Sequence, residues 1–475
     1  MSRRPPFGLL AAGVVLLSGL GCGRVPLDWN QDGGGTIEVG GHDALDTSGF
    51  ELLGAPLIFS PKADGFSVSV VLRKGDPTAL QLRVRAESAS NATGWGPGTS
   101  PAADTAQWTV TGLQPGQRYT YDVCLHQDGT FGALSCDGLL YTGSAMTTRP
   151  PGAEFTFVAM ADTHIEPRDP VPPGSTIIND IYGSMENTLQ AVTADVAAAK
   201  ADFIINMGDL LDYHLFGFNT PPPDSAWARL AYLNYRRMMG DTLGTAAHFP
   251  VIGNWDGESG CNTAAEIQRS VSQRRLYAPG PLANTYPEGG SANGDYYAFT
   301  WGDALFVILN VMTYTPTCHL LSVQPGLPDD WTLGPTQLAW LETTLSHSTA
   351  KWKFTFIHHT VGGNAGNDVD TAYGRGGGRA AYVGEQATVH GLLRKYGVQI
   401  FFYAHDHVFT DMVVDGIHYT LPGSAGAPWK FDTSETGYTS YWPDSGYGRV
   451  KVSAARVTVD FVAMGGGLLS SFSLP

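Results

Sequence analysis

Five short apolar runs in the chain each end in a polar motif. In chain order, Phe155–Met160 leads into Asp162 and His164, and Phe203–Met207 leads into Gly208-Asp209. Pro250–Ile252 leads into Gly253-Asn254, Phe354–Ile357 into His358-His359, and Ile400–Tyr403 into His405 and His407. Apolar runs of this length predict buried strands, and ligand sites in open α/β sheets lie beyond the carboxyl ends of such strands. We therefore expect seven nitrogen or oxygen donors to meet at one edge of a sheet, in a site for two metal ions.

A different hydrophobic pattern occupies residues 50–149. The segments Val68–Leu72 and Leu80–Arg85 alternate, or nearly alternate, between apolar and polar side chains, as half-buried strands do. The segment Leu113–Val123 resembles the entry to the penultimate strand of a fibronectin type III domain, with a tyrosine corner at Tyr119 or Tyr121. We therefore expect an all-β sandwich, either similar to fibronectin type III or another small sandwich with a similar turn. Its role is either that of a spacer or binding module, or that of a wall beside the metal site.

The order of the five motifs, DxH, GD, GN, H and HxH, resembles that of the calcineurin-like metallophosphoesterase superfamily over roughly residues 153–425. The resemblance implies an α/β fold for residues 150–475, in which a β-sandwich core is flanked by helices in an αββα arrangement. It also implies a metal-dependent phosphoesterase. The alternative is an unrelated α/β domain in which ordinary hydrogen bonds satisfy the polar strand ends.

The same resemblance assigns a role to each motif residue. The first ion would be held by Asp162, His164 and His407, and the second by Asn254, His358 and His405. Asp209 would bridge the two ions. The bridging carboxylate would span the ions with its two oxygens. Two ions about 3.5–4 Å apart would polarise a phosphate and turn a shared water into the attacking hydroxide near neutral pH. Mixed imidazole and carboxylate ligation suits divalent or trivalent Fe, Mn or Zn.

The third motif departs from the family pattern. The family usually reads GNHD or GNHE, whereas residues 253–256 read Gly-Asn-Trp-Asp. The resemblance implies that this histidine would contact the phosphate and protonate the leaving oxygen. The indole of a tryptophan cannot shuttle a proton near neutral pH. The expected catalytic residues are Asn254 and Asp256, with His359 or His214 as a substitute for the histidine. The alternative roles are a supporting hydrogen bond for His359 and a surface position for His214.

Two residues are expected to contact the substrate. Trp255 occupies the position of the missing histidine, beside a predicted ligand. Arg375 lies in the glycine-rich segment 374–379 after the fourth motif, and an arginine on such a loop can clamp a phosphate through two hydrogen bonds. The alternative for Arg375 is a solvated loop position.

Purple acid phosphatases provide a useful contrast, because they also carry a β-sandwich before the catalytic domain. They place a tyrosine ligand three residues after the GD aspartate, where this chain has Asp212, and they lack the histidine that this chain has at His164. We therefore expect the metal site of the broader phosphomonoesterase and phosphodiesterase group.

The N-terminus predicts export. Arg3 and Arg4 precede an apolar stretch over about residues 7–20, which is short for a membrane span and typical of a signal peptide. Residues 18–22 resemble a bacterial lipobox, so residues 1–21 would be removed and lipid on Cys22 would anchor the mature chain to the cell envelope, on its periplasmic or outer face. Residues 22–49 would form a flexible linker. The alternative is ordinary signal cleavage nearby.

Four cysteines remain after Cys22, and an even number in an exported protein indicates disulfides. The simplest pairing joins Cys124 with Cys136 in the sandwich and Cys261 with Cys318 in the catalytic domain. The alternative is free buried thiols.

The net charge of −16 argues against a nucleic-acid partner, because such binding depends on clustered Lys and Arg. We therefore expect a small phosphate ester as substrate and no protein partner. The interpretation is an exported two-metal hydrolase of phosphate monoesters or diesters. Its alternative is a weakly catalytic or non-catalytic surface lipoprotein that binds metals.

Overall fold

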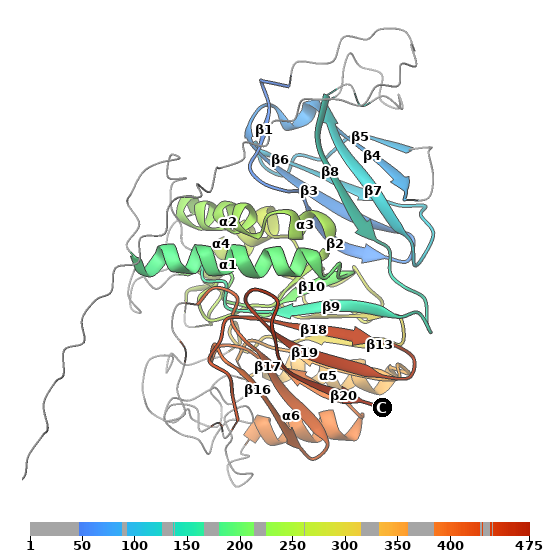
Figure 1. Cartoon of the computed structure of the whole chain (residues 1–475), viewed down its shortest axis with the longest axis vertical. Helices are drawn as coiled ribbons and strands as arrows, with labels where there is room; N and C mark the ends of the chain where they lie inside the picture. The colour runs from blue at the N-terminus through green and yellow to red at the C-terminus, as the bar shows by residue number, and fades with distance from the viewer. Residues whose placement is uncertain are drawn as a thin grey trace, which may run out of the picture. The chain divides into compact units, whose positions relative to one another are not determined.

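Two β-sheets packed face to face form the core of the described part of residues 155–475 (Figure 1). In the first sheet the strand order is β11 (Ala247–Pro250), β10 (Phe203–Asn206), β9 (Phe155–Met160), β18 (Gly446–Val452), β19 (Val457–Ala463) and β20 (Leu468–Leu474). In the second it is β12 (Tyr297–Trp301), β13 (Ala304–Ile308), β14 (Trp352–Phe356), β15 (Ile400–Phe402), β17 (Ile417–Pro422) and β16 (Phe409–Val414). Strands β9, β10 and β11 are parallel, as are β13, β14, β15 and β17. The carboxyl ends of the motif-bearing strands therefore lie together in each sheet.

The computed structural model describes residues 47–87, 93–125, 136, 138–165, 180–212, 225–260, 262–314, 332–359, 384–427, 430, 438 and 440–475. Within these ranges no helix is both long and apolar enough to cross a membrane. The predicted signal segment, Cys22 and most of the predicted linker lie outside the described residues, as do Cys261 and Cys318.

Helices cover the outer faces of both sheets (Figure 1). The first sheet packs against α1 (Asp180–Ala198), α2 (Ser225–Met239), α3 (Asp241–Thr245) and α4 (Ala264–Tyr277). The second sheet packs against α5 (Gly334–His347) and α6 (Gly384–Lys395). A capping box between Thr263 and Glu266 begins α4, which satisfies backbone N–H groups that the first helical turn leaves unpaired. The arrangement confirms the αββα fold.

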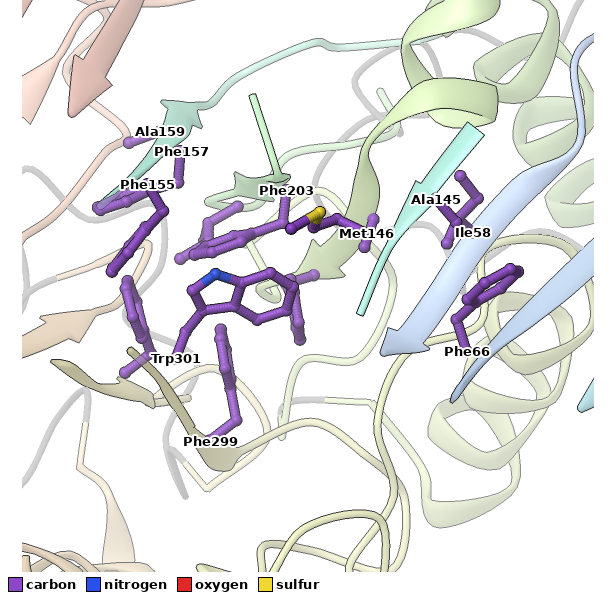
Figure 2. Close-up of a cluster of buried hydrophobic side chains, with 14 of the residues drawn as sticks. Ile58, Phe66, Ala145, Met146, Phe155, Phe157, Ala159, Phe203, Phe299 and Trp301 are labelled. Carbon is purple, nitrogen blue, oxygen red and sulfur yellow. The ribbon is translucent and has the colours of Figure 1, made fainter. Parts of the chain in front are cut away.

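Aromatic side chains fill the space between the two sheets. Phe157 and Phe203 stack with ring centroids 5.3 Å apart, and Phe306 meets Phe157 edge-on at 5.1 Å. Such pairs stabilise a core by about 0.5–1.5 kcal/mol each beyond their buried area. Figure 2 shows that this cluster continues from Phe203 and Trp301 towards Met146, which belongs to the preceding β-rich region.

One predicted strand was misplaced. The apolar run Pro250–Ile252 predicted a strand, whereas β11 is Ala247–Pro250 and ends where that run begins. The sequence pattern missed the strand because it contains His248, a polar residue that is nonetheless fully buried. Its Nε2 lies 2.7 Å from the hydroxyl of Tyr235, so a hydrogen bond makes the burial tolerable.

Residues 51–146 form two four-stranded antiparallel sheets within the described part of the chain. One contains β1 (Glu51–Leu52), β2 (Leu57–Lys62), β3 (Gly65–Lys74) and β6 (Thr105–Val110). The other has the order β5 (Thr93–Pro97), β4 (Leu80–Ala86), β7 (Arg118–Leu125) and β8 (Gly138–Met146). The predicted strands Val68–Leu72 and Leu80–Arg85 lie within β3 and β4. The disulfide between Cys124 and Cys136 is present as predicted.

The structure separates the two candidates for the tyrosine corner. The hydroxyl of Tyr119 accepts a hydrogen bond of 2.9 Å from the backbone N–H of Gln114, five residues upstream, which is the geometry of that corner. The hydroxyl of Tyr121 instead donates to the carbonyl of Gly244 at 2.9 Å. Tyr119 therefore forms the corner, and Tyr121 joins the sandwich to α3.

A buried arginine also links the sandwich to the catalytic domain. Arg236 of α2 is 1% exposed and donates to the hydroxyl of Ser69 at 3.0 Å and to the carbonyl of Ser69 at 2.5 Å. Burial lowers the pKa of its guanidinium to about 9. A second link is the ion pair of Arg149 with Asp202, in which Nη2 lies 3.0 Å from Oδ1. These contacts hold the two regions in one compact unit.

Replacing Asp122 with asparagine is expected to lower the free energy of unfolding by about 2 kcal/mol at pH 7. The carboxylate is 2% exposed and accepts hydrogen bonds from Arg83, Arg85 and Thr142, each at 2.7 Å. Burial raises its pKa, but the bonds from Thr142 and Arg83 and the arginine charges outweigh burial and hold the pKa below its ordinary value. The stabilisation is therefore present above about pH 4 and is lost as the pH falls through the folded-state pKa.

Thermal unfolding of the native chain and the Asp122→Asn variant at pH 7 and at pH 3 measures this effect. The control is Glu51→Gln, because Glu51 pairs with Arg73 in an exposed salt bridge of little expected value. Equal stability of the Asp122 variant and the native chain at pH 7 would contradict the prediction.

Candidate metal centre

The backbone at the predicted site is held in an unusual conformation. Eight described residues other than glycine have positive φ, and five of them are predicted metal ligands: Asp162 (55°), His164 (47°), Asp209 (50°), His405 (78°) and His407 (60°). Left-handed backbone costs about 1–3 kcal/mol at a residue other than glycine and concentrates at functional sites. The fold therefore holds these five residues in an unfavourable backbone conformation that directs their side chains toward a common point.

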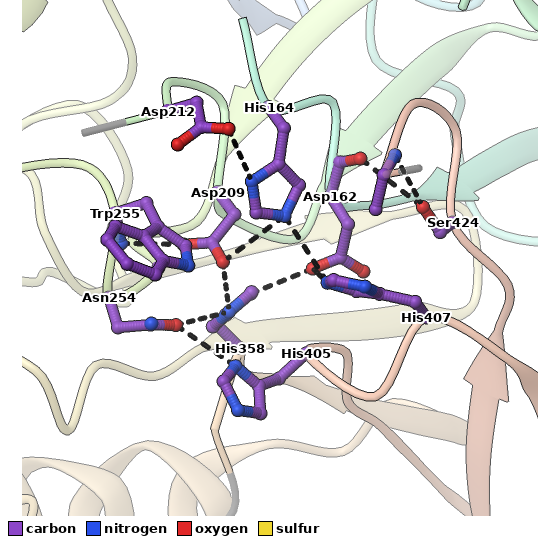
Figure 3. Close-up of polar contacts among 12 residues, drawn as sticks. Asp162, His164, Asp209, Asp212, Asn254, Trp255, His358, His405, His407 and Ser424 are labelled. Atoms are coloured by element: carbon purple, nitrogen blue, oxygen red, sulfur yellow. Dashed lines mark hydrogen bonds and ion pairs between the residues drawn. The ribbon is translucent and has the colours of Figure 1, made fainter. Parts of the chain in front are cut away.

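One group of ligand atoms comes from Asp162, His164 and His407, which are all buried. Nε2 of His164 lies 3.3 Å from Nε2 of His407, and the latter lies 3.5 Å from Oδ1 of Asp162. Figure 3 shows the three side chains pointing toward one another. Burial raises the pKa of Asp162, but the charges of His407, His358 and His164 outweigh it and hold that pKa below its usual value. A carboxylate and two imidazoles thus face one small volume.

A second group surrounds the side-chain oxygen of Asn254. Nε2 of His358 lies 3.0 Å from Asn254 Oδ1, and Nδ1 of His405 lies 3.1 Å from it (Figure 3). Nε2 of His359 is also 3.1 Å from this oxygen. The three imidazoles form a set that can hold a metal ion.

Asp209 lies between the two groups. Its Oδ2 is 3.1 Å from Nε2 of His358 in the second group and 3.7 Å from Nε2 of His164 in the first. Its Oδ1 accepts a hydrogen bond of 2.8 Å from the backbone N–H of Trp255. Oδ2 of Asp209 therefore faces both groups while Oδ1 accepts a backbone hydrogen bond, and the bridging role of Asp209 stays a prediction.

Two supporting contacts orient the imidazoles. Nδ1 of His358 lies 2.8 Å from the carbonyl oxygen of Met207, which leaves Nε2 directed at the site. Nδ1 of His164 lies 3.7 Å from Oδ2 of Asp212, behind the ring. Partners of this kind fix the tautomer of a metal-binding histidine. The sequence marks Asp212 only as the residue that replaces the tyrosine ligand of purple acid phosphatases. Its position three residues after Asp209 also indicates that it lies near the metal site.

A loop far along the chain positions Asp162. The backbone N–H groups of Gly426 and Ala427 donate to the carbonyl oxygen of Asp162 at 3.0 and 2.9 Å. A Cβ at Gly426 would lie 2.3 Å from the carbonyl oxygen of Thr163, so only glycine allows this approach. The side chain of Lys430, shortly after this loop, is half-buried, and burial lowers its pKa to about 8. No motif in the sequence marked this segment.

Asp256 joins the second and third motifs. Its Oδ1 accepts from the backbone N–H of Leu211 at 3.1 Å, and its Oδ2 accepts from that of Gly253 at 2.8 Å. It is fully buried, and burial together with the charge of Asp209 raises its pKa to about 7. The structure thus gives Asp256 a positioning contact, while its catalytic role stays a prediction. His214 and Arg375 lie outside the described residues, so their roles also stay predictions.

Metal ions would satisfy the polar side-chain atoms of this site better than hydrogen bonds among these side chains do. Neither carboxylate oxygen of the buried Asp162 accepts a hydrogen bond from a described residue. In one orientation of the Asn254 amide, its oxygen has two lone pairs and faces three imidazole nitrogens. In the orientation rotated by half a turn, its two N–H bonds face four acceptors. The rotated amide is itself satisfied, since its oxygen then accepts from the indole N–H of Trp255 at 3.2 Å, but its two N–H bonds cannot serve all four acceptors. Cations within the two groups would satisfy these side-chain atoms, whose imidazole, carboxylate and amide chemistry suits a first-row metal.

Metal affinity is expected to fall by at least about tenfold for each pH unit below 9. Burial lowers the pKa of His358, but the charges of Asp209 and Asp162 outweigh it and raise that pKa to about 9 in the metal-free chain. Below this pH, a metal ion must displace the proton of His358 to bind. Competition with a chelator of known affinity at pH 6.5, 7.5 and 8.5 measures the slope, and affinity that is constant over this range would contradict it.

A family model for calcineurin-like phosphoesterases matches residues 155–409, more than half of the chain. No curated protein sequence matches the chain. Among solved structures, PhoD is similar with a TM-score of 0.62 and 15% identity, over 89% of this chain and 89% of PhoD. A dimetal phosphatase from Danio rerio is similar with a TM-score of 0.43 and 14% identity, over 67% of this chain and 98% of that one. The similarity to PhoD shows a shared fold.

Proposed function

Since the chain belongs to the calcineurin-like phosphoesterase family, it is a metal-dependent phosphoesterase, and we propose that it hydrolyses small phosphate esters outside the cytoplasm. The proposal joins the metal centre to the N-terminal sequence, which is typical of an exported lipoprotein. The net charge of −16 favours a small substrate over a nucleic acid.

The observation that carries the proposed reaction is the position of Asp209 between two groups of ligand atoms. Oδ2 of Asp209 faces His358 at 3.1 Å and His164 at 3.7 Å. Asp209 would therefore serve both ions, with Asp162, His164 and His407 holding the first and Asn254, His358 and His405 holding the second. When bound, such a pair of ions supplies a deprotonated water near neutral pH and neutralises charge on the phosphate.

The chain's own residues keep the donors in place during the reaction. Met207 and Asp212 hold the rings of His358 and His164, and the backbone N–H of Trp255 holds the unused oxygen of Asp209. Fixed donors need no reorganisation as charge develops, which is the main source of electrostatic catalysis. The ligand chemistry is consistent with Fe, Mn or Zn.

Trp255 favours substrates with a good leaving group. The indole is half-buried beside Asn254 and Asp209 (Figure 3), and it has no proton to exchange near neutral pH. A phosphate ester whose leaving group is stable as an anion does not need that proton. The same observation favours a second candidate function, that of a metal-containing surface protein with little or no catalysis.

The proposed location rests on the lipobox-like residues 18–22. Lipid on Cys22 would hold the mature chain at a bacterial membrane, and residues 22–49 would tether the fibronectin III-like sandwich and catalytic domain. A Cys22→Ser variant is expected to move from the membrane fraction to the soluble periplasmic or external fraction. Retention of this variant in the membrane fraction would remove the proposed anchor.

Assays with para-nitrophenyl phosphate and its bis ester test the proposed reaction. The chain from residue 22 onward, made without lipid, is stripped of metal and reloaded with Mn, Zn or Fe. Turnover that depends on metal supports the hydrolase, and the preferred ester identifies a monoesterase or a diesterase. Two bound metals without turnover of either ester would favour the binding-protein candidate.

A further inference from the structure

We propose that His359 is an additional ligand of the second metal ion, which gives that ion a third imidazole that the family pattern does not provide. The inference rests on the proposed two-metal site and concerns one side chain of this chain. In the motif order of the family, the fourth motif contributes one histidine, whereas this chain has His358 followed by His359.

The first support is distance. Nε2 of His359 lies 3.1 Å from Oδ1 of Asn254, and the corresponding distances for the expected ligands are 3.0 Å for His358 and 3.1 Å for His405. Two donors that each lie about 2.1 Å from a metal, at right angles, are about 3.0 Å apart. His359 therefore stands in the same relation to Asn254 as the two expected ligands do.

The second support is the arrangement of the rings. The ring of His359 packs on that of His405 with centroids 3.7 Å apart, and its centroid lies 5.4 Å from that of His358. His359 is 4% exposed, so its imidazole is held in the site and does not extend into solvent. One nitrogen from each of the three rings lies within 4.8 Å of the others. The rings thus converge from two strand ends, those of β14 and β15.

The third support is the chemistry of the amide. If His359 only supported Asn254 by a hydrogen bond, the amide could not serve all of its neighbours in either orientation: the oxygen has two lone pairs for three imidazoles, and the rotated nitrogen has two N–H bonds for four acceptors. A cation resolves this conflict, because the oxygen and all three nitrogens can direct lone pairs at it. His359 then acts as a ligand on the same terms as its neighbours.

This ligand makes the two ions unequal. The second ion would have five protein donors, from Asp209, Asn254, His358, His359 and His405, and the first would have four. With equal coordination numbers, the first ion would have more room for a phosphate oxygen. The second ion, rich in nitrogen, would be the more tightly bound.

Metal binding to the His359→Ala variant tests the assignment without relying on activity. The dissociation constant of the tighter ion is measured by chelator competition with Zn, and the ligand field by absorption of the Co-loaded chain. We expect a loss of affinity above 100-fold, beyond the 10–100-fold typical of a residue that only supports a ligand, together with a changed Co spectrum. A loss below 100-fold with an unchanged spectrum would overturn the assignment.

Two matched variants complete the test. His347→Ala removes an exposed histidine of α5 and is expected to leave both readouts unchanged. His359→Gln keeps a polar side chain if the alanine variant fails to fold, and a native Co spectrum in it would overturn the assignment. Native-like metal binding by the His359 variants leaves the proposed phosphoesterase intact, whereas a native chain that binds no metal removes both proposals.

Discussion

Replacing Asp209 with asparagine is expected to reduce bound metal from two ions per chain to one or none and to lower phosphoesterase turnover by about 10³-fold or more. Oδ2 of Asp209 faces Nε2 of His358 at 3.1 Å and Nε2 of His164 at 3.7 Å, so it lies between the two expected ligand groups. A neutral amide bridges two cations poorly. Asparagine also tolerates the left-handed backbone of this position, where φ is 50°, so the fold should survive.

Metal content by elemental analysis and turnover of para-nitrophenyl phosphate measure the two effects together. Asp212→Asn is the matched control, because Asp212 supports His164 at 3.7 Å and lies outside the expected ligand set. The control is expected to keep two ions and to lose about 10–100-fold in activity. Unchanged metal content in Asp209→Asn would show that Asp209 is not the bridge.

Replacing Trp255 with histidine is expected to raise turnover of alkyl phosphates by about 10²-fold and that of nitrophenyl esters much less. Histidine restores a group that can give a proton to the leaving oxygen, and an alkoxide needs that proton far more than a nitrophenolate does. The hydrogen bond to Asp209 Oδ1 comes from the backbone N–H of residue 255, so the substitution preserves it.

The ratio of kcat/KM for an alkyl phosphate to that for para-nitrophenyl phosphate is the measured quantity. Trp255→Phe removes the indole N–H and adds no titratable group, so its ratio should remain that of the native chain. Equal or lower rates of Trp255→His on both substrates would show that residue 255 does not limit proton transfer. His214, the other predicted substitute for the missing histidine, would then remain as the candidate acid.

The motif-bearing strands were predictable because each combines a short apolar run with polar residues at its carboxyl end. In a parallel sheet that pattern specifies both the strand and the edge at which its ligands lie. The structure brings Asp162, Asp209 and His358 together from β9, β10 and β14, which confirms the expected convergence. The tyrosine corner was predictable for a similar local reason, although only the structure separates Tyr119 from Tyr121.

Other features depend on contacts between distant residues and could not be predicted from local sequence. His248 is polar but buried by a hydrogen bond with Tyr235, so the pattern misplaced β11. The backbone of Gly426 and Ala427 holds Asp162 across more than two hundred residues of sequence. The orientation of the Asp209 carboxylate likewise depends on a hydrogen bond from the backbone N–H of Trp255, which no residue type could reveal.

Uptake of metal by the metal-free chain, followed together with turnover, tests whether the chain is a two-metal phosphoesterase. Manganese is added in steps to the chain from residue 22 onward, and bound metal and hydrolysis of para-nitrophenyl phosphate are measured at each step. We expect two tightly bound ions per chain, with turnover rising as the second ion binds. Fewer than two bound ions, or turnover that does not depend on metal, would contradict it.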